Sequence, residues 1–206
     1  MLSWMDAPAA FSNRDRLHCR SLILATLLGG WLLGGWLLGW GGLLARGEDP
    51  ATVARQRIQF VSTADGTTQQ AYLILPRVRS RRPTPMVVNL HSWSADMEQR
   101  SELEGLVQAR GWVYLAPNFR GPNNRPQACG SPVAQQDVLD AVEWAIEHHG
   151  VDRDSVFLTG ASGGGHMTML MVGRYPTRCK AASAWVGISD LASWHRKHQG
   201  SRYGEM

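Results

Sequence analysis

The stretch FLTGASGGGHM, residues 157–167, places a serine between glycines at the point where an apolar run ends. Residues 160–164 satisfy the pattern G-x-S-x-G, with Ser162 at its centre. A buried strand is expected before the pattern and a helix after it, which is the context that this pattern requires when its serine is a nucleophile. The alternative is a glycine-rich turn that holds a phosphate. A dinucleotide fingerprint, however, has a different glycine spacing and lies near the first strand of its domain.

The chemistry of this turn depends on its glycines. Side chains at 160 or 164 would collide with their neighbours in so tight a turn, and the serine would be displaced to the carboxyl edge of the sheet, where its Oγ meets substrate. The N–H of Gly163, at the start of the helix, would point to a developing oxyanion, whose charge the helix dipole favours. The pattern therefore predicts Ser162 as nucleophile and Gly163 as an oxyanion donor.

A second oxyanion donor is expected from the loop LHSWS, residues 90–94, which ends an earlier strand. In α/β sheets with a nucleophilic serine, the corresponding strand-to-helix loop supplies a backbone N–H to the oxyanion. The candidates are the N–H groups of Trp93 and Ser92, and His91 is expected to support the loop through hydrogen bonds rather than act as a base. The alternative is an ordinary loop with a buried tryptophan.

Strands and helices alternate along the rest of the chain. A hairpin is expected around Asp65-Gly66, and each later strand is followed by a helical pattern. The expected strands are 57–63, 69–76, 85–91, 112–117, 155–160 and 180–189, and the expected helices are 97–110, 132–149 and 166–175. This alternation predicts an α/β fold, with a mostly parallel sheet flanked by helices and a hairpin at one edge.

The N-terminal sequence is typical of a leader segment. Three arginines between residues 14 and 20 precede an uncharged apolar segment at 21–45. This order is typical of an export signal. Cleavage before Glu48 and retention of 21–45 as an uncleaved membrane anchor both remain open. Residues 1–47 are therefore predicted to be a signal peptide or anchor. Residues 48–206 are predicted to be the folded domain, which is periplasmic, extracellular or membrane-anchored and facing outside, with membrane contact only through 21–45.

Charge and residue spacing exclude some classes of partner and cofactor, and the cysteines leave one disulfide open. The whole chain carries a formal charge of +4, and residues 48–206 carry 17 basic and 15 acidic side chains, which argues against a nucleic-acid partner. No grouping of His, Cys and carboxylates has the spacing of metal ligands, so neither a metal nor another cofactor is expected. Cys129 and Cys179 could form a disulfide in an oxidising compartment or remain as two thiols.

Four segments together carry a family resemblance: GASGGGHM (160–167), LHSWS (90–94), NFRGPNNRPQACGS (118–131) and QDVLDAVEWA (136–145). They resemble the secreted α/β-hydrolases of the prolyl oligopeptidase-like group, family S9, over roughly residues 57–200. The resemblance implies an α/β-hydrolase fold and an exported serine peptidase or carboxylesterase that works through an acyl-enzyme on Ser162. One alternative is an acetyl or feruloyl esterase acting on polysaccharide. Another is a non-catalytic, membrane-anchored binding module.

The acid and base of a catalytic triad are harder to place. In this fold the chain order is Ser, then Asp or Glu, then His, and the resemblance puts the last two after strands that would lie beyond Met206. We therefore expect a truncated domain without its C-terminal strands, and weak catalysis by this chain alone. Asp190 is a candidate for the catalytic acid, but we prefer its interpretation as the N-cap of a short helix. We expect His166 to be a packing residue and His195 to lie on a solvent-exposed face of that helix.

Overall fold

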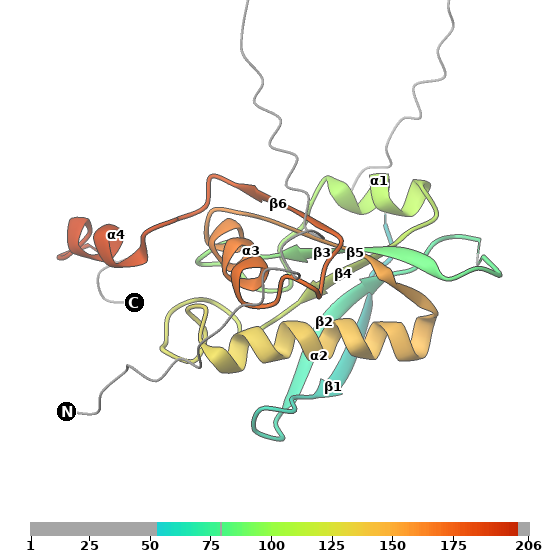
Figure 1. The fold of residues 1–206 in the computed structure, drawn as a ribbon, viewed down its shortest axis with the longest axis horizontal. Helices are drawn as coiled ribbons and strands as arrows, with labels where there is room; N and C mark the ends of the chain where they lie inside the picture. The colour runs from blue at the N-terminus through green and yellow to red at the C-terminus, as the bar shows by residue number, and fades with distance from the viewer. Residues whose placement is uncertain (1–52, 79, 202–206) are drawn as a thin grey trace, which may run out of the picture.

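The computed structural model describes residues 53–78 and 80–201, and within them a single mixed sheet is flanked by helices (Figure 1). The strands are β1 (Gln56–Val61), β2 (Thr68–Ile74), β3 (Thr84–Leu90), β4 (Val113–Pro117), β5 (Val151–Ala161) and β6 (Ala181–Trp185). The helices are α1 (Leu103–Ala109), α2 (Pro132–His149), α3 (Gly163–Arg174) and α4 (Leu191–Lys197).

The sheet has the order β1-β2-β4-β3-β5-β6. β1 and β2 form an antiparallel hairpin, and β2 joins β4 antiparallel, whereas β3 pairs in parallel with both β4 and β5, and β5 with β6. The predicted α/β architecture, with a parallel centre and a hairpin at one edge, is confirmed. Because β3, β4 and β5 run in the same direction, their carboxyl ends and the loops that follow them meet at one edge of the sheet.

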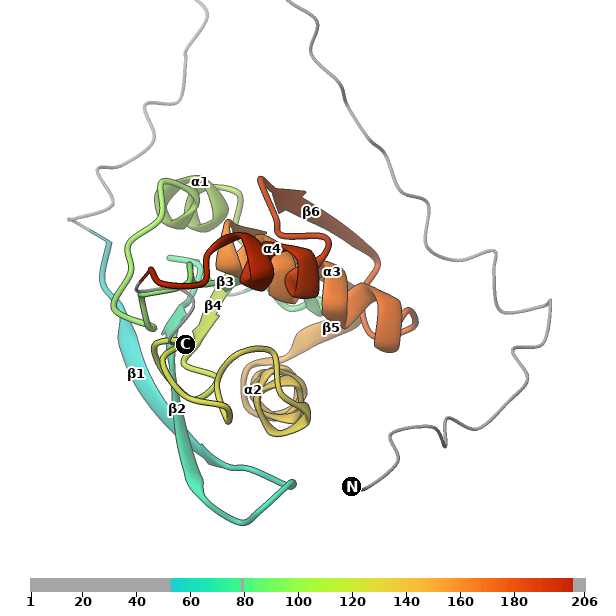
Figure 2. The same ribbon diagram turned by 90° about the vertical axis from the view of Figure 1, so that its left-hand side faces the viewer.

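Each face of the sheet has its own apolar cluster, and Figure 2 shows the helices that cover the two faces. α2 and α3 cover one face, where Val138 and Met167 pack with strand residues such as Val88. α1 covers the other face, where Val107 packs with Ile74 and residues of β4. The continuous burial of β4 follows from its position between two covered faces, which is why its sequence is apolar without alternation.

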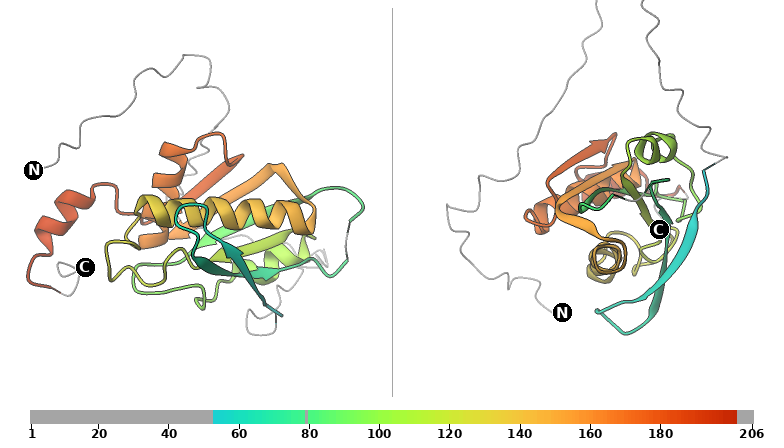
Figure 3. Two further views of the ribbon diagram at one scale, coloured as in Figure 1. Left: turned by 90° about the horizontal axis from the view of Figure 1, so that it is seen from below. Right: turned by 90° about the vertical axis from the view of Figure 1, so that its right-hand side faces the viewer.

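α2 crosses the sheet as the longest helix among the described residues (Figure 3). Its bounds follow from local chemistry. Ser131 precedes it in an extended conformation, its Oγ accepts the Ala134 N–H at 3.2 Å, and Pro132 occupies the first turn. Gly150 ends it in the left-handed conformation, with φ of 64°. These predicted boundaries are confirmed.

The expected helix at 97–110 is wrong in its first part, because α1 begins only at Leu103. The guanidinium of Arg55 donates to the carbonyl oxygens of three residues, Met97, Glu98 and Gln99, at 2.7–3.2 Å. Those carbonyls would accept the first helical hydrogen bonds in a longer helix. Arg55 is itself held by an ion pair with the fully buried Glu104, so a long-range charge pair replaces the helical turn.

Three other expected boundaries shift by three residues or more. β5 begins at Val151 rather than at 155. α3 begins at Gly163 rather than at 166, because the glycines after the serine already form the first helical turn. β6 ends at Trp185, short of the expected 189, and Val186 follows with a positive φ of 42°. A strand cannot continue through that backbone conformation.

The predicted leader, residues 1–47, lies outside the described residues, and so does its apolar segment 21–45. Within the part of the chain that the structure describes, no helix combines the length and apolar character that a bilayer crossing requires. The two described cysteines are thiols rather than a disulfide. Cys129 donates its S–H to the Asn123 carbonyl at 3.3 Å, and burial raises the pKa of this thiol, while Cys179 is buried in the core.

Candidate active site

Ser162 lies in the turn between β5 and α3, at the carboxyl edge of the sheet, with an exposed side chain. Its φ of 55° and ψ of −117° are unusual for a residue with a Cβ, and such backbone strain persists only where the surroundings enforce it. Here the Ser162 N–H donates to the Trp185 carbonyl at 2.9 Å, and the Ser162 carbonyl accepts the His166 N–H at 3.0 Å. The strained residue is thus held from β6 and from α3.

The glycines on either side of Ser162 make close backbone contacts. A Cβ at Gly160 would lie 2.4 Å from the Gly164 carbonyl oxygen, and one at Gly164 would lie 2.0 Å from the Leu90 carbonyl oxygen. Neither distance leaves room for a methyl group. The structure therefore agrees with the steric argument that the sequence pattern suggested.

The residue after the serine faces the loop that follows β3. A Cβ at Gly163 would lie 2.6 Å from the backbone nitrogen of Trp93, so the two backbones touch. The Ser92 hydroxyl donates to the Ala161 carbonyl at 3.2 Å, which ties this loop to the end of β5. Gly163, Trp93 and Ser92, which the sequence assigned to one oxyanion site, are thus neighbours beside Ser162.

Gln99 is a contact of this loop that the sequence reasoning missed. Its Oε1 accepts the Ser92 N–H at 2.8 Å, and its Nε2 donates to the Ser92 hydroxyl at 3.4 Å. The sequence placed Gln99 inside a helix, and no local signal distinguishes it from the other polar residues there. Only the early bend of the chain at 97–102 brings it to Ser92.

His91 supports the same loop from inside the molecule, where it is almost fully buried. Its Nδ1 lies 3.1 Å from the Ser92 carbonyl oxygen and its Nε2 lies 3.0 Å from the Asn118 carbonyl oxygen. Its ring stacks on Phe119 with 3.9 Å between centroids. Burial lowers the pKa of His91, so the imidazole is mainly neutral at pH 7 and donates to one of the two carbonyls. These contacts suit a supporting role.

Two of the three candidate acid and base residues, Asp190 and His166, have a local hydrogen-bond partner. Asp190 caps α4, with its Oδ1 accepting the Ser193 N–H at 2.8 Å. His166 Nδ1 lies 2.7 Å from the Ile188 carbonyl oxygen, and His195 is an exposed residue of the last turn of α4. Across residues 53–78 and 80–201, no side chain hydrogen-bonds the Ser162 hydroxyl, and no three His, Cys, Asp or Glu side chains gather as metal ligands.

A parallel sheet that presents a glycine-flanked serine at its carboxyl edge, beside the loop of an earlier strand, defines the α/β-hydrolase fold. Solved structures agree: the acylaminoacyl peptidase of Pyrococcus horikoshii superposes with a TM-score of 0.61 at 20% identity, covering 77% of this chain and 27% of that one. The sequence profile of the prolyl oligopeptidase family matches residues 99–205, more than half of the chain. The chain belongs to this family.

Curated relatives include both peptidases and esterases. The dipeptidyl aminopeptidase BIII of Pseudoxanthomonas mexicana is 26% identical over 147 residues, which cover 64% of this chain and 21% of that protein. An acetylxylan esterase of Coprinopsis cinerea is 40% identical over 52 residues, which cover 25% of this chain and 14% of that one. The chain thus spans about a fifth of the length of the peptidase relatives that it matches.

Proposed function

We propose that this protein is a serine hydrolase that cleaves peptide or ester bonds through an acyl-enzyme on Ser162. The observation that carries this proposal is the backbone of Ser162, which has a positive φ and is held between β6 and α3 while its side chain stays exposed. A glycine-rich turn that bound phosphate would have no need to strain a serine in this way.

In the proposed reaction, Ser162 Oγ attacks the substrate carbonyl carbon, and the electron pair of the C=O bond moves onto its oxygen. The N–H groups of Gly163 and Trp93 stabilise that oxyanion. A general base takes the hydroxyl proton and passes it to the leaving group, and water then hydrolyses the acyl-enzyme. Among the described residues no side chain is placed against the Ser162 hydroxyl to act as that base. Removing one oxyanion donor of this kind costs about 10²–10³ in kcat in a well-studied protease.

We assign the second donor to Trp93 rather than to Ser92. The Ser92 N–H already donates to Gln99 Oε1 at 2.8 Å, and the Trp93 nitrogen lies on the side of the loop that touches Gly163. The Gln99 side chain orients the loop by accepting the neighbouring N–H. In this arrangement Ser92 and Gln99 position the donor without themselves meeting the oxyanion.

We favour a peptidase, since the family profile spans residues 99–205, which include Ser162. The second candidate is an esterase acting on acetylated or feruloylated polysaccharide, which the likeness to the acetylxylan esterase over 52 residues supports. We also propose export, directed by the basic and apolar N-terminal segment, with either cleavage before Glu48 or anchoring through 21–45. The N-terminal residue of the cell-made protein, read by mass spectrometry, distinguishes those two forms.

The experiment that tests the nucleophile is labelling of the full chain with a fluorophosphonate. Ser162 Oγ attacks phosphorus, a P–O bond forms, fluoride leaves and the hydroxyl proton passes to solvent. We expect a slow, single label on Ser162, because no described side chain hydrogen-bonds its hydroxyl to take the proton. Labelling should be lost in Ser162→Ala and unchanged in Ser189→Ala, which removes another exposed serine. A folded wild-type chain that takes no label would overturn the proposal in favour of a binding module.

Reporter substrates then separate the two enzyme classes. We expect hydrolysis of an aminoacyl p-nitroanilide to be abolished by Ser162→Ala. Turnover confined to p-nitrophenyl acetate and acetylated xylan would instead favour the esterase.

A further inference from the structure

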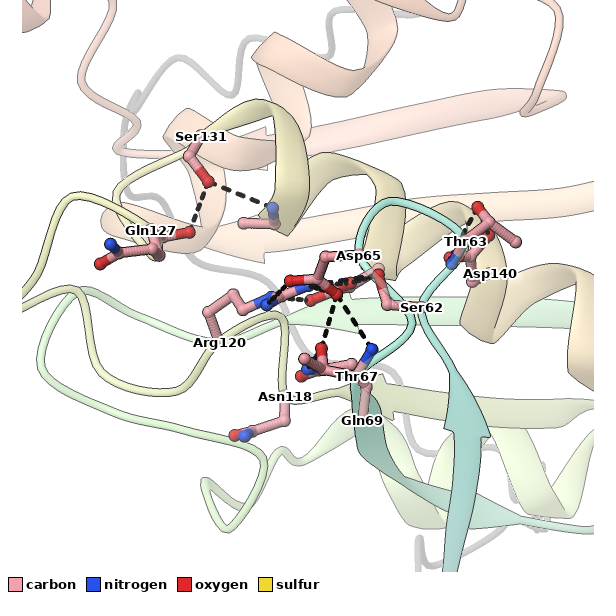
Figure 4. Close-up of polar contacts among 12 residues, drawn as sticks. Ser62, Thr63, Asp65, Thr67, Gln69, Asn118, Arg120, Gln127, Ser131 and Asp140 are labelled. Carbon is pink, nitrogen blue, oxygen red and sulfur yellow. Dashed lines mark hydrogen bonds and ion pairs between the residues drawn. The ribbon is translucent and has the colours of Figure 1, made fainter.

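A charged cluster, the Arg120 cluster (Arg120, Asp65, Asp137 and Ser62), lies at the edge of the sheet where β4 ends (Figure 4). Arg120 follows β4, and its side chain is only 10% exposed. Its Nη1 donates to Asp65 Oδ2 at 2.7 Å, and its Nε and Nη2 donate to the two oxygens of Asp137 at 2.5 and 3.0 Å. Asp137 is fully buried and also accepts the Ser62 hydroxyl at 2.6 Å.

The Arg120 cluster joins three parts of the fold. Asp65 and Ser62 belong to the β1–β2 hairpin turn, Asp137 belongs to α2, and Arg120 belongs to the loop after β4. A guanidinium suits this place because its planar fork binds one carboxylate with two donors and still reaches a second one. A lysine carries the same charge but cannot make this set of directed hydrogen bonds.

The loop that Arg120 holds has a strained backbone. Phe119 and Arg120 are consecutive non-glycine residues with positive φ, 27° and 78°. Such conformations persist only where side-chain contacts enforce them. The bidentate contact with Asp137 and the contact with Asp65 supply that constraint.

The strained turn contacts His91 directly. The Phe119 ring stacks on the imidazole with an interplanar angle of 9°, and the Asn118 carbonyl oxygen lies 3.0 Å from His91 Nε2. On its other side, His91 faces the Ser92 carbonyl at 3.1 Å, next to the Trp93 nitrogen that touches Gly163. A contiguous series of contacts therefore runs from Arg120 to the Trp93 backbone.

We propose that Arg120 is a positioning residue for the proposed oxyanion site: by holding the turn at 118–121 against Asp65 and Asp137, it keeps His91, and through it the loop at 91–99, in place. This inference rests on the proposed function for its consequence in catalysis. Its structural part, that Arg120 orders the loop at 91–99, is independent of whether Ser162 reacts.

A matched control is available in the same region. Asp140, also on α2, accepts the Thr63 N–H at 2.7 Å and the Thr63 hydroxyl at 2.9 Å, and so ties the same hairpin to the same helix. No hydrogen bond or ion pair of Asp140 among the described residues reaches the turn at 118–121. Asp140→Asn should therefore loosen the hairpin without releasing His91.

The test is amide hydrogen exchange of the full chain, followed by mass spectrometry, in the wild type, Arg120→Lys and Asp140→Asn. We expect Arg120→Lys to speed exchange of peptides covering 91–99 about tenfold, while Asp140→Asn leaves them near the wild-type rate. Unchanged exchange at 91–99 in a folded Arg120→Lys protein would overturn the proposal, and so would an equal increase in both variants.

A second readout connects this order to reactivity. The rate constant for fluorophosphonate labelling of Ser162 should fall about tenfold in Arg120→Lys. It should stay unchanged in Asp140→Asn, even where the two variants lose the same free energy of unfolding. If the wild type does not label, the proposed function fails and the exchange result still decides the role of Arg120. If Arg120→Lys does not fold, Asp65→Asn replaces it, since that variant removes the outer carboxylate and keeps the contact with Asp137.

Discussion

The Ser162 turn and the Arg120 cluster lie at the same edge of the sheet and hold strained backbone by different means. Around Ser162, residues 160–164 carry no charged side chain, and the strain is held by backbone packing. Around Arg120, ion pairs between buried charges hold the strained backbone. Steric packing of this kind tolerates no added atom, whereas the charge cluster depends on the directed hydrogen bonds of the guanidinium, on charge and on pH.

The largest effect should come from the Ser162 turn. In Gly164→Ala the new Cβ would lie 2.0 Å from the Leu90 carbonyl oxygen, which is backbone and cannot move aside without breaking the sheet. We expect a loss of more than about 3 kcal/mol in the free energy of unfolding, measured by urea denaturation, or no folded protein at all.

Gly173→Ala is the control for that prediction, because nothing lies within 4 Å of a Cβ at that helical position. It should stabilise the chain by about 0.5–1 kcal/mol, since alanine is the better helix former. Equal stabilities of the two variants would show that the close approach around Ser162 is not a steric limit.

A smaller effect is expected in the Arg120 cluster from Asp137→Asn. The substitution keeps the shape of the side chain but removes a fully buried negative charge opposite the guanidinium. Arg120 retains Asp65, so we expect a loss of about 2–3 kcal/mol, less than the roughly 3–5 kcal/mol for leaving a buried charge without any partner. Urea denaturation at neutral pH measures it. A neutral outcome would mean that hydrogen bonding alone, without charge, holds the turn.

The smallest effect should be a change in pH dependence at Asp65. Hydrogen bonds from Arg120, and then from Thr67, hold the pKa of the Asp65 carboxyl well below its ordinary value of 3.8. A folded-state pKa below the unfolded one adds stability that is present above about pH 4 and is lost as the pH falls towards the folded pKa.

Asp65→Asn should therefore flatten the fall in the urea midpoint between about pH 4 and pH 2, with little change in its slope at neutral pH. The wild type measured in the same buffers is the reference. Parallel pH profiles for the two proteins would show that other carboxylates govern acid unfolding.

Much of the fold could be predicted because its signals are local. The hairpin at Asp65-Gly66, the Ser131 cap and the Gly150 end of α2 each depend on residues within a few positions of one another. The prediction of a helix over the whole of 97–110 was wrong because a long-range contact determines where that helix begins. Arg55, more than forty residues earlier in the chain, binds the carbonyls that the first helical turn would have used.

Some features of the candidate site also follow from local sequence, and others depend on contacts between distant segments. The sequence alone determined the Ser162 turn and the proximity of the loop after β3, because tight strand-to-helix turns demand glycine and parallel strands end at one edge. Only the tertiary structure favours Trp93 over Ser92 as the proposed donor, and only it brings Gln99 to the loop and the turn at 118–121 against His91. Hydrogen bonds and ion pairs between distant segments depend on how the chain packs, and no short pattern of residues encodes them.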